Sequence, residues 1–354
     1  MNKNFFITTG GSGGHVIPAT ILYDHLSKEN NVIISTDKRG LKFLDKKKYQ
    51  LKVIDTPKLN NFLILPFNLI KILFLTINSF FLLKSKKIEK IFSTGGYMSL
   101  PLILAAKALR LNIYLIEPNQ VLGRANKYFL NSCKKIFCYS EKIKNFPENF
   151  KNKIETIKPL ISKNVYNLEL NNKTKEKFTI LIVGGSQGAD IFDKNLKNSI
   201  VNISKNFPLK IIHQTSEKNI LQLKEFYLKN NIENKTFCFE KNFILNIQQS
   251  DLCITRAGAT TLAELSFLNV PFITVPLPTS KDNHQLENAK FYQENGCSWN
   301  IEQNFFEQNI ENTLKDILEK KSEYMEKKEN LKKLNYQNTW INVNEKILRS
   351  INEN

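Results

Sequence analysis

Apolar runs of four to seven residues alternate with longer amphipathic stretches along most of the 354-residue chain. The buried strands of a parallel sheet are continuous apolar runs, whereas the helices that connect them are amphipathic. Alternation of the two patterns is therefore typical of βαβ units. Ten apolar runs are predicted to be strands: residues 5–8, 31–36, 90–94, 112–117 and 135–140, then 178–184, 209–214, 235–239, 251–255 and 271–276.

A polar segment rich in lysine and asparagine, roughly residues 158–177, separates the two series of strands and is expected to be a linker. The sequence GGSGG at 10–14 recurs as GGSQG at 184–188, each time directly after an apolar run. A chain of this length is expected to form about two domains. We therefore predict an α/β protein of two similar, doubly wound, Rossmann-like domains facing a central cleft, with ligands at the carboxyl ends of the strands.

The chain carries a formal net charge of +18, which compositional bias toward lysine explains in large part. A basic surface favours anionic partners, either nucleic acid or an anionic membrane. No RNA-binding or helix-turn-helix signature is present, and the lysines are spread along the chain. A membrane surface is therefore expected rather than nucleic acid.

The cysteines form no CxxC pair, and no histidine lies at metal-ligand spacing: Cys133, Cys138, Cys238, Cys253 and Cys297. With no signal peptide at the N-terminus, these cysteines are expected to be reduced thiols of a cytoplasmic protein. No DxD-like carboxylate pair follows a predicted strand, so neither a metal nor a cofactor is expected.

The first glycine-rich stretch places Ser12 and His15 where a turn opens into a predicted helix. Glycine lets a backbone approach a ligand closely, although a tight strand-to-helix connection without a ligand is the alternative. Neither glycine loop ends in the GK[ST] of a Walker motif or fits a dinucleotide fingerprint. The expected ligand is a nucleotide-like or sugar-phosphate group.

The sequence DLCITRAGATTLAEL at 251–265 predicts a strand followed by a helix that begins near Thr260 or Thr261. A threonine cap with Glu264 would form a capping box. Alternatively, the helix N-terminus binds a pyrophosphate and Glu264 accepts hydrogen bonds from ribose hydroxyls. The polar cluster KDNHQ at 281–285 either caps the next helix, which is expected to end near Gly296, or recognises a sugar.

The ordered series GGSGGH, STGGYMSLP, EPN with GRANKYF, VGGSQGA, RAGATTLAE and KDNHQLENA spans nearly the whole chain and resembles the MurG family. Its members are UDP-N-acetylglucosamine–N-acetylmuramyl-(pentapeptide) pyrophosphoryl-undecaprenol N-acetylglucosamine transferases. The resemblance implies a two-domain GT-B fold whose final helix returns to the first domain. It implies two domains. Residues 1–160, with the helix 338–354 packed back on them, would bind the acceptor and the membrane, and residues 161–337 would bind the UDP-sugar.

The resemblance also implies a set of donor-binding residues: Ser12, Gly13, Gly14, Asn119, Ser186, Ala259, Thr260, Thr261, Leu262, Ala263, Glu264 and Gln285. Within it, Glu264 matches the ribose-binding carboxylate and Gln285 a residue that reads the N-acetylglucosamine hydroxyls. Ser186 matches a phosphate or uridine contact. The chain departs from the family at Pro118, where glutamine is common, and near Ile161, where an arginine is expected.

The implied reaction transfers N-acetylglucosamine from UDP to the C4 hydroxyl of the muramyl unit of lipid I, with inversion, for peptidoglycan synthesis. His15 is the favoured general base, with acceptor positioning or a structural hydrogen bond as alternatives. A UDP-N-acetylglucosamine 2-epimerase of the same fold is the alternative enzyme, and a non-catalytic nucleotide-sugar binder at the membrane is the alternative of another class.

The stretch 60–87 has an apolar core from Phe62 to Leu83, followed by Lys84, Lys86 and Lys87. Three interpretations are open: a transmembrane helix, a buried core helix, or a helix in the membrane interface. Polar residues form a narrow stripe at helical spacing, which favours the interface: Asn68, Lys71, Asn78 and Ser79. We therefore expect a peripheral protein on the cytoplasmic face of the cell membrane.

Overall fold

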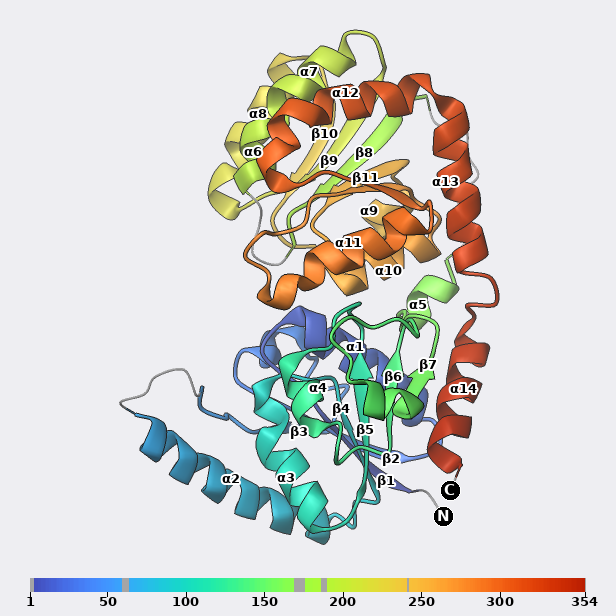
Figure 1. The fold of residues 1–354 in the computed structure, drawn as a ribbon. Coiled ribbons are helices and arrows are strands. Elements are labelled where there is room, and N and C mark those ends of the chain that lie inside the picture. Colours follow the sequence, from blue (N-terminus) through green and yellow to red (C-terminus); the bar gives the residue numbers. More distant parts are fainter. Residues whose placement is uncertain (1–2, 59–63, 169–175, 186–189, 241, 354) are drawn as a thin grey trace. The chain divides into compact units, whose positions relative to one another are not determined.

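The computed structural model describes residues 3–58, 64–168, 176–185, 190–240 and 242–353. Contacts divide the chain into two compact units. Unit 1 comprises Met1–Tyr166 together with Thr339–Asn354, and unit 2 comprises Asn167–Asn338. Each unit is a parallel sheet with helices on both faces, as predicted for a doubly wound α/β chain (Figure 1).

The sheet of unit 1 has the strand order β3-β2-β1-β4-β5-β6-β7. Its strands are β1 Asn4–Thr8, β2 Asn31–Thr36, β3 Leu51–Val53, β4 Lys90–Ser93, β5 Asn112–Glu117, β6 Lys135–Cys138 and β7 Ile154–Thr156. Its helices are α1 Gly13–Leu26, α2 Leu65–Ser85, α3 Leu100–Ala108, α4 Arg124–Phe129, α5 Lys163–Tyr166 and α14 Trp340–Asn352. Short 3-10 helices are η1 Gly40–Phe43, η2 Tyr97–Ser99 and η3 Glu148–Lys153.

Side chains of β1 alternate between the two hydrophobic cores of unit 1. Phe5 and Ile7 pack in one core with α1 and α14. Phe6 packs in the other core with α3. This alternation follows from the two-residue repeat of a strand, and the central strand is apolar throughout because helices cover both of its faces.

The sheet of unit 2 has the strand order β10-β9-β8-β11-β12-β13. Its strands are β8 Phe178–Val183, β9 Leu209–Gln214, β10 Glu233–Phe237, β11 Leu252–Thr255, β12 Phe272–Thr274 and β13 Ser298–Asn300. Its helices are α6 Asp190–Asn195, α7 Lys197–Ser204, α8 Ile220–Lys229, α9 Phe243–Gln248, α10 Ala259–Phe267, α11 His284–Glu294, α12 Phe306–Glu319 and α13 Lys321–Leu334. Short 3-10 helices are η4 Glu217–Asn219, η5 Lys281–Asn283 and η6 Gln303–Phe305.

Each of the ten predicted strands is present in the structure within a few residues of its expected bounds. The three strands that were not predicted are β3, β7 and β13, each three residues long. These strands lie at sheet edges, where only one neighbour supplies hydrogen bonds and the apolar run is too short to be distinctive. The predicted helix end near Gly296 is confirmed, since α11 ends at Glu294 and Gly296 has a φ of +66°.

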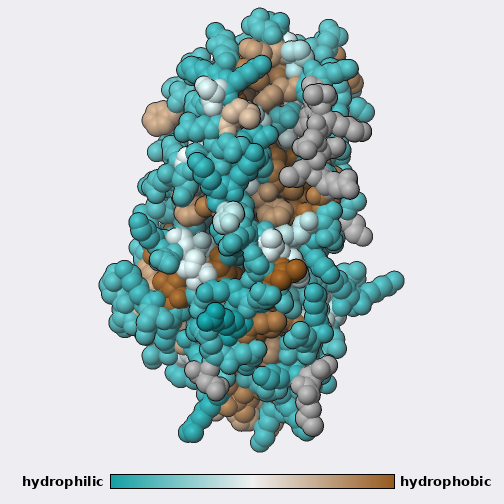
Figure 2. All heavy atoms as spheres, turned by 90° about the vertical axis from the view of Figure 1, so that its right-hand side faces the viewer, coloured by the Kyte–Doolittle hydropathy of each residue, from teal (hydrophilic) through white to brown (hydrophobic). Residues whose placement is uncertain are grey.

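Helix α2 packs on α3 and is long and apolar enough to cross a membrane. Only 11% of its most apolar 18-residue stretch is buried inside the protein. The core-helix interpretation is therefore wrong. The buried side chains are Ile72, Ser79 and Leu83. Large apolar side chains cover the opposite face and are exposed: Phe67, Leu69, Ile70, Leu73, Phe74, Ile77 and Phe81. Ser79 of the predicted polar stripe thus faces the protein. The side of the structure shown in Figure 2, from which α14 is seen, is by contrast mostly hydrophilic.

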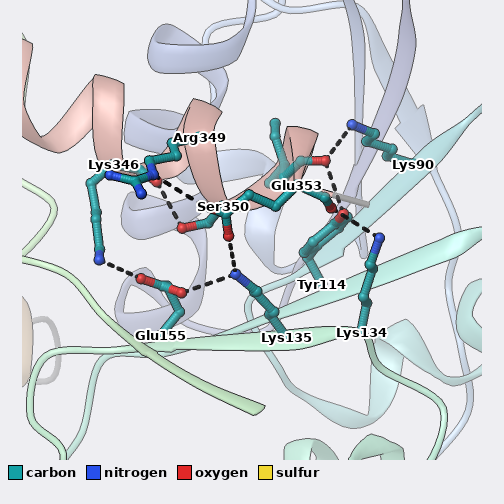
Figure 3. A network of polar contacts seen from close by, with 10 residues as sticks. Lys90, Tyr114, Lys134, Lys135, Glu155, Lys346, Arg349, Ser350 and Glu353 are labelled. Carbon is teal, nitrogen blue, oxygen red and sulfur yellow. Dashed lines mark hydrogen bonds and ion pairs between the residues drawn. The ribbon is translucent and has the colours of Figure 1, made fainter. Parts of the chain in front are cut away.

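The C-terminal helix α14 is held against the sheet of unit 1 by lysines at the strand starts (Figure 3). The buried Lys90 donates from Nζ to the carbonyl oxygen of Ile351 at 2.6 Å. Glu155 accepts from Lys135 at 3.1 Å and pairs with Lys346 at 2.6 Å. Carbonyl groups at the end of a helix lack intrahelical donors, so these lysines stabilise the end of α14.

Trp340 begins α14, is 8% exposed, and stacks on the His25 ring with centroids 3.6 Å apart. We expect Trp340→Ala to destabilise unit 1 by about 3–5 kcal/mol, because a large buried side chain is lost. Ile341→Ala is the matched control, since Ile341 is 65% exposed on the same helix. Hydrogen exchange measures the unfolding of each unit separately. Equal destabilisation by both variants would contradict this account of α14.

Candidate functional site

The first glycine loop lies where the strand order of unit 1 reverses, because β1 stands between β2 and β4. Ligands of doubly wound sheets bind at such a switch point. Gly11 has a φ of +85°, and its amide donates to Asp37 Oδ1 at 2.9 Å. Helix α1 begins at Gly13 with Ser12 as its N-cap, and no side chain caps its first turn. The amides of Gly13 and Gly14 therefore point to a position that suits an anion.

His15 stands in the first turn of α1 and reaches the loop that follows β4. Its Nδ1 lies 2.8 Å from the carbonyl oxygen of Thr94. Because a carbonyl only accepts, the neutral ring carries its proton on Nδ1 and its lone pair on Nε2. A Cβ at Gly95, whose φ is +87°, would lie 3.5 Å from Cε1 of His15. The half-buried imidazole is therefore held in one tautomer and one orientation, as a general base requires.

Asn119 follows β5, the next strand of the sheet, and is positioned by the buried carboxylate of Glu117. Glu117 Oε1 accepts from Nδ2 of Asn119 at 3.0 Å, and Oε2 accepts from the amide of Gly123 at 2.8 Å and from Nδ2 of Asn126 at 3.0 Å. The structure thus brings His15 and Asn119 to the same edge of one sheet.

The corresponding switch point of unit 2 lies between β8 and β11. Ser186, in the loop after β8, is outside the described residues. The other predicted residues of this unit follow β11 and β12. Arg256 fixes the two strand ends, since its guanidinium donates to the Val275 carbonyl at 3.0 Å and to Oε1 of Gln303 at 2.7 Å.

Helix α10 begins at Ala259 with Gly258 as the N-cap, and no side chain caps it. The capping-box interpretation of Thr260 or Thr261 with Glu264 is therefore wrong, because both threonines lie inside the first turn. Oγ1 of Thr260 is buried, with no hydrogen-bond partner in the described part of the chain. The amides of the first turn of α10 therefore remain able to bind an anion.

Leu262 and Ala263 are buried in the core, and the Leu262 amide already donates to the Gly258 carbonyl at 3.0 Å. Neither the Leu262 side chain nor the Ala263 side chain is therefore placed to bind a ligand. Within the predicted stretch, the groups that can meet a ligand are the first-turn amides and the carboxylate of Glu264.

Glu264 lies one turn into α10, and part of its surface reaches solvent. The surrounding protein nevertheless desolvates the carboxylate, which raises the pKa of Glu264 to about 7. Among the described residues, no cation or hydrogen-bond donor contacts this side chain. A desolvated carboxylate without a donor is prepared to accept hydrogen bonds from hydroxyl groups of a ligand.

Gln285 lies in the first turn of α11, after the loop that follows β12. Its Oε1 accepts from the amide of Leu277 at 3.0 Å, so its side chain holds the proline-containing loop. Asp282 and Asn283 both have a φ of 54°, and Asn283 is the N-cap of α11. Because Oε1 of Gln285 is engaged by the Leu277 amide, the side-chain nitrogen of Gln285 is the group left to donate to a ligand.

The remaining histidines serve the fold. His25 is buried against Trp340, and burial lowers its pKa to about 4. His284 is half-buried, and its Nδ1 lies 2.8 Å from the Lys281 carbonyl oxygen. His213 is fully buried, with Nε2 3.2 Å from Oδ1 of Asp193. In the described residues, no group of three or more histidine, cysteine, aspartate or glutamate side chains could hold a metal ion.

Asp37 and Asp193 were not predicted from the sequence, although each carboxylate accepts hydrogen bonds from a loop at the carboxyl ends of the strands. Oδ1 of Asp37 accepts from the amides of Gly11 and Gly40, both at 2.9 Å. Asp193 accepts from Asn219 Nδ2 at 2.8 Å and pairs with His213. Asp37 directly follows the predicted strand 31–36, and a carboxylate at that position is the signal that could have identified it.

Known protein families match the chain over both units. The glycosyltransferase family 28 N-terminal domain matches residues 5–138, and the family 28 C-terminal domain matches residues 179–339. A relative from Pelagibacter ubique (strain HTCC1062) is 50% identical over the full length of both chains. It is a UDP-N-acetylglucosamine–N-acetylmuramyl-(pentapeptide) pyrophosphoryl-undecaprenol N-acetylglucosamine transferase. A transferase of the same name from Rickettsia canadensis is 36% identical over 85% of this chain and 86% of its own.

Solved structures share the fold. The crystal structure of MurG from Acinetobacter baumannii matches with a TM-score of 0.77 at 25% identity, over 99% of both chains. A UDP-GlcNAc 2-epimerase from Neisseria meningitidis matches with a TM-score of 0.70 at 15% identity, over 99% of this chain and 100% of its own. These likenesses confirm the predicted GT-B fold.

The raised pKa of Glu264 predicts how the stability of unit 2 depends on pH. Its folded-state pKa of about 7 exceeds 4.5, the ordinary pKa of a glutamate side chain. The stabilisation from this group is therefore complete below about pH 4.5 and is lost as the pH rises through 7. We expect Glu264→Gln to stabilise unit 2 at pH 8 by roughly 1–3 kcal/mol and to change little at pH 4. Thermal unfolding at the two pH values measures the difference, and a less stable variant at pH 8 would contradict the desolvation.

Proposed function

The chain belongs to the MurG family, and we propose that it transfers N-acetylglucosamine from UDP-N-acetylglucosamine to the C4 hydroxyl of the muramyl unit of lipid I, giving lipid II. The observation that carries this proposal is 50% identity over the full chain to a relative with this acceptor and sugar in its name. The epimerase structures are more distant, at 15% identity or less among those compared, and support only the fold. The proposed product is a precursor of peptidoglycan, which links the enzyme to cell shape and division.

We infer that unit 2 binds the donor. The uncapped first turn of α10 suits a pyrophosphate, and Glu264 offers two oxygens to the ribose hydroxyls. Gln285 would donate to the sugar, and Ser186 would contact the phosphates or the uridine. As the bond from the anomeric carbon to UDP breaks, negative charge builds on the diphosphate, and positive helix ends stabilise that charge.

Unit 1 would bind the acceptor and supply the base. The lone pair on Nε2 of His15 takes the proton of the C4 hydroxyl while the acceptor oxygen bonds to the anomeric carbon. The electron pair of the breaking bond leaves with UDP. A single displacement of this kind inverts the anomeric configuration. Ser12, Gly13, Gly14 and Asn119 line the same sheet edge and would contact the diphosphate groups of the acceptor and of the donor.

Helix α2 supports peripheral binding at the cytoplasmic face of the cell membrane. Its polar Ser79 faces the protein, while Phe67, Phe74 and Phe81 are 62–73% exposed. Lys84 and Lys86 follow at its end and are exposed, so they can meet anionic headgroups. An undecaprenyl-linked acceptor stays in the bilayer. The exposed apolar face of α2 is therefore suited to bind the lipid surface.

The test of the proposed function uses radiolabelled UDP-N-acetylglucosamine with and without a lipid I analogue. Transfer of label to the analogue, with UDP released only when the analogue is present, supports the proposal. Conversion of the donor to its 2-epimer without an acceptor would identify an epimerase instead. Donor binding without either product would identify a non-catalytic binder.

The assigned role of His15 predicts the behaviour of His15→Asn, which keeps a donor near the Thr94 carbonyl but has no base. We expect turnover to fall by roughly 10²-fold or more, the usual contribution of a positioned base. Donor affinity should change little, because the ribose and sugar contacts proposed for Glu264 and Gln285 lie on unit 2. The kinetics of both substrates and the affinity for UDP measure this split. Turnover within a few-fold of the wild type would exclude His15 as the base.

The exposed face of α2 predicts membrane release by a quadruple variant, Leu73→Ser, Phe74→Ser, Ile77→Ser and Phe81→Ser. Phe80 is left intact because it packs against the core. We expect the variant to leave anionic vesicles in sedimentation assays while activity on a soluble acceptor persists. The matched control, Leu221→Ser, Leu228→Ser and Phe239→Ser, removes exposed apolar groups of unit 2 and should remain bound. Continued binding of the α2 variant would contradict the membrane contact.

A further inference from the structure

Arg39 lies beside the first glycine loop and is held there by the buried Asp37. Nε of Arg39 donates to Oδ2 of Asp37 at 2.8 Å, while Oδ1 accepts from the amide of Gly11. Burial alone would raise the pKa of Asp37. The hydrogen bonds from Gly11 and Arg39 nevertheless lower this pKa below its ordinary value. One ionised carboxylate thus joins the glycine loop and the guanidinium in a fixed geometry.

A second contact fixes the far side of the guanidinium. Nη2 of Arg39 donates to the hydroxyl of Tyr97 at 2.8 Å, and the guanidinium carbon lies 5.6 Å from the centre of the Tyr97 ring. A methyl group at Gly11 would lie 3.4 Å from Nη2 and 2.8 Å from Cε of Met98. The glycine loop therefore packs directly on this side chain.

The guanidinium retains hydrogen-bonding capacity toward a ligand. Nε and Nη2 are engaged, but Nη1 has no partner among the described residues, and the side chain is 47% exposed. A guanidinium presents its donors in a planar fork that matches phosphate oxygens. Arg39 therefore combines a fixed position, a permanent charge and unused donors at the edge of the proposed substrate site.

The neighbouring elements indicate which phosphate group Arg39 meets. Tyr97 belongs to η2, which leads directly into α3, and α2 packs on α3. Thr56, in the segment that leads toward α2, donates to the Met98 carbonyl at 3.2 Å. The cation and the exposed apolar helix are thus linked within unit 1, whereas the proposed donor contacts of Glu264 and Gln285 are on unit 2.

We propose that Arg39 binds the pyrophosphate of the lipid-linked acceptor, with Asp37 and Tyr97 as the residues that position its guanidinium. The inference rests on the proposed function, because it assigns the acceptor to unit 1. A lipid whose tail remains in the bilayer beside α2 carries its pyrophosphate near the headgroups. Arg39 selects this group by its charge and by the N–H donors of Nη1, and so contributes to recognition of the acceptor rather than to the chemical step.

The experiment measures binding of two short-chain acceptor analogues, one with the pyrophosphate and one with a monophosphate, in the absence of donor. We expect wild-type protein to prefer the pyrophosphate analogue and Arg39→Gln to weaken its binding by about 10- to 100-fold, as loss of charge-assisted hydrogen bonds does. Affinity for UDP should stay within twofold. Lys38→Gln is the matched control, because Lys38 is the neighbouring residue and its side chain is 78% exposed.

Tyr97→Phe provides a variant that keeps the charge of Arg39 and removes only the hydroxyl that holds Nη2. It should weaken binding of the pyrophosphate analogue in the same direction but by less. An unchanged preference in Arg39→Gln, an equal loss in Lys38→Gln, or a loss of UDP affinity in Arg39→Gln would each overturn the proposal. So would a wild-type protein that does not distinguish the analogues. Failure of wild-type protein to transfer sugar would count against the proposed function, since binding is read without transfer.

Discussion

All strands of a parallel sheet end at the same edge, and this constraint gathers the candidate site of each unit. In unit 1 it brings the loops after β1, β4 and β5 together, with His15 bound to the Thr94 carbonyl across the switch point. In unit 2 it brings together the segments after β11 and β12, which contain Glu264 and Gln285. Helices begin at this edge, so unpaired amides and their positive dipole ends collect there.

The helix starts at these edges lack a side-chain cap, a feature that α1 and α10 share with helices such as α12 and α13. Thr339 caps α14 by accepting from the amide of Asn342 at 3.2 Å, whereas α1 and α10 have no side-chain cap. Beside the start of α1, the buried carboxylate of Asp37 fixes the glycine loop, and the buried carboxylate of Glu117 fixes the loop that contains Asn119. Rigid surroundings with unpaired donors reduce the reorganisation that ligand binding and catalysis require.

Apolar runs were sufficient to predict the ten longer strands, because a sheet covered on both faces requires continuous apolar runs. The short edge strands carry no such run. The capping box failed because Gly258, not a threonine, precedes α10. Helical spacing identified the polar stripe of α2, but only packing shows that Ser79 is buried and that Phe74 and Phe81 are exposed. The roles of Asp37 and Arg39 depend on contacts between residues far apart in sequence, which a local pattern does not contain.

The central claim is that the two sheet edges divide the substrates, with the ribose and sugar of the donor on unit 2 and the lipid-linked acceptor on unit 1. Hydrogen exchange of the full chain with each substrate alone tests this division most directly. UDP-N-acetylglucosamine should protect amides of residues 256–264, and the acceptor analogue should protect amides of residues 10–16 and 94–97. A donor that leaves residues 256–264 unprotected, or an acceptor analogue that protects these residues and not residues 10–16, would contradict the account.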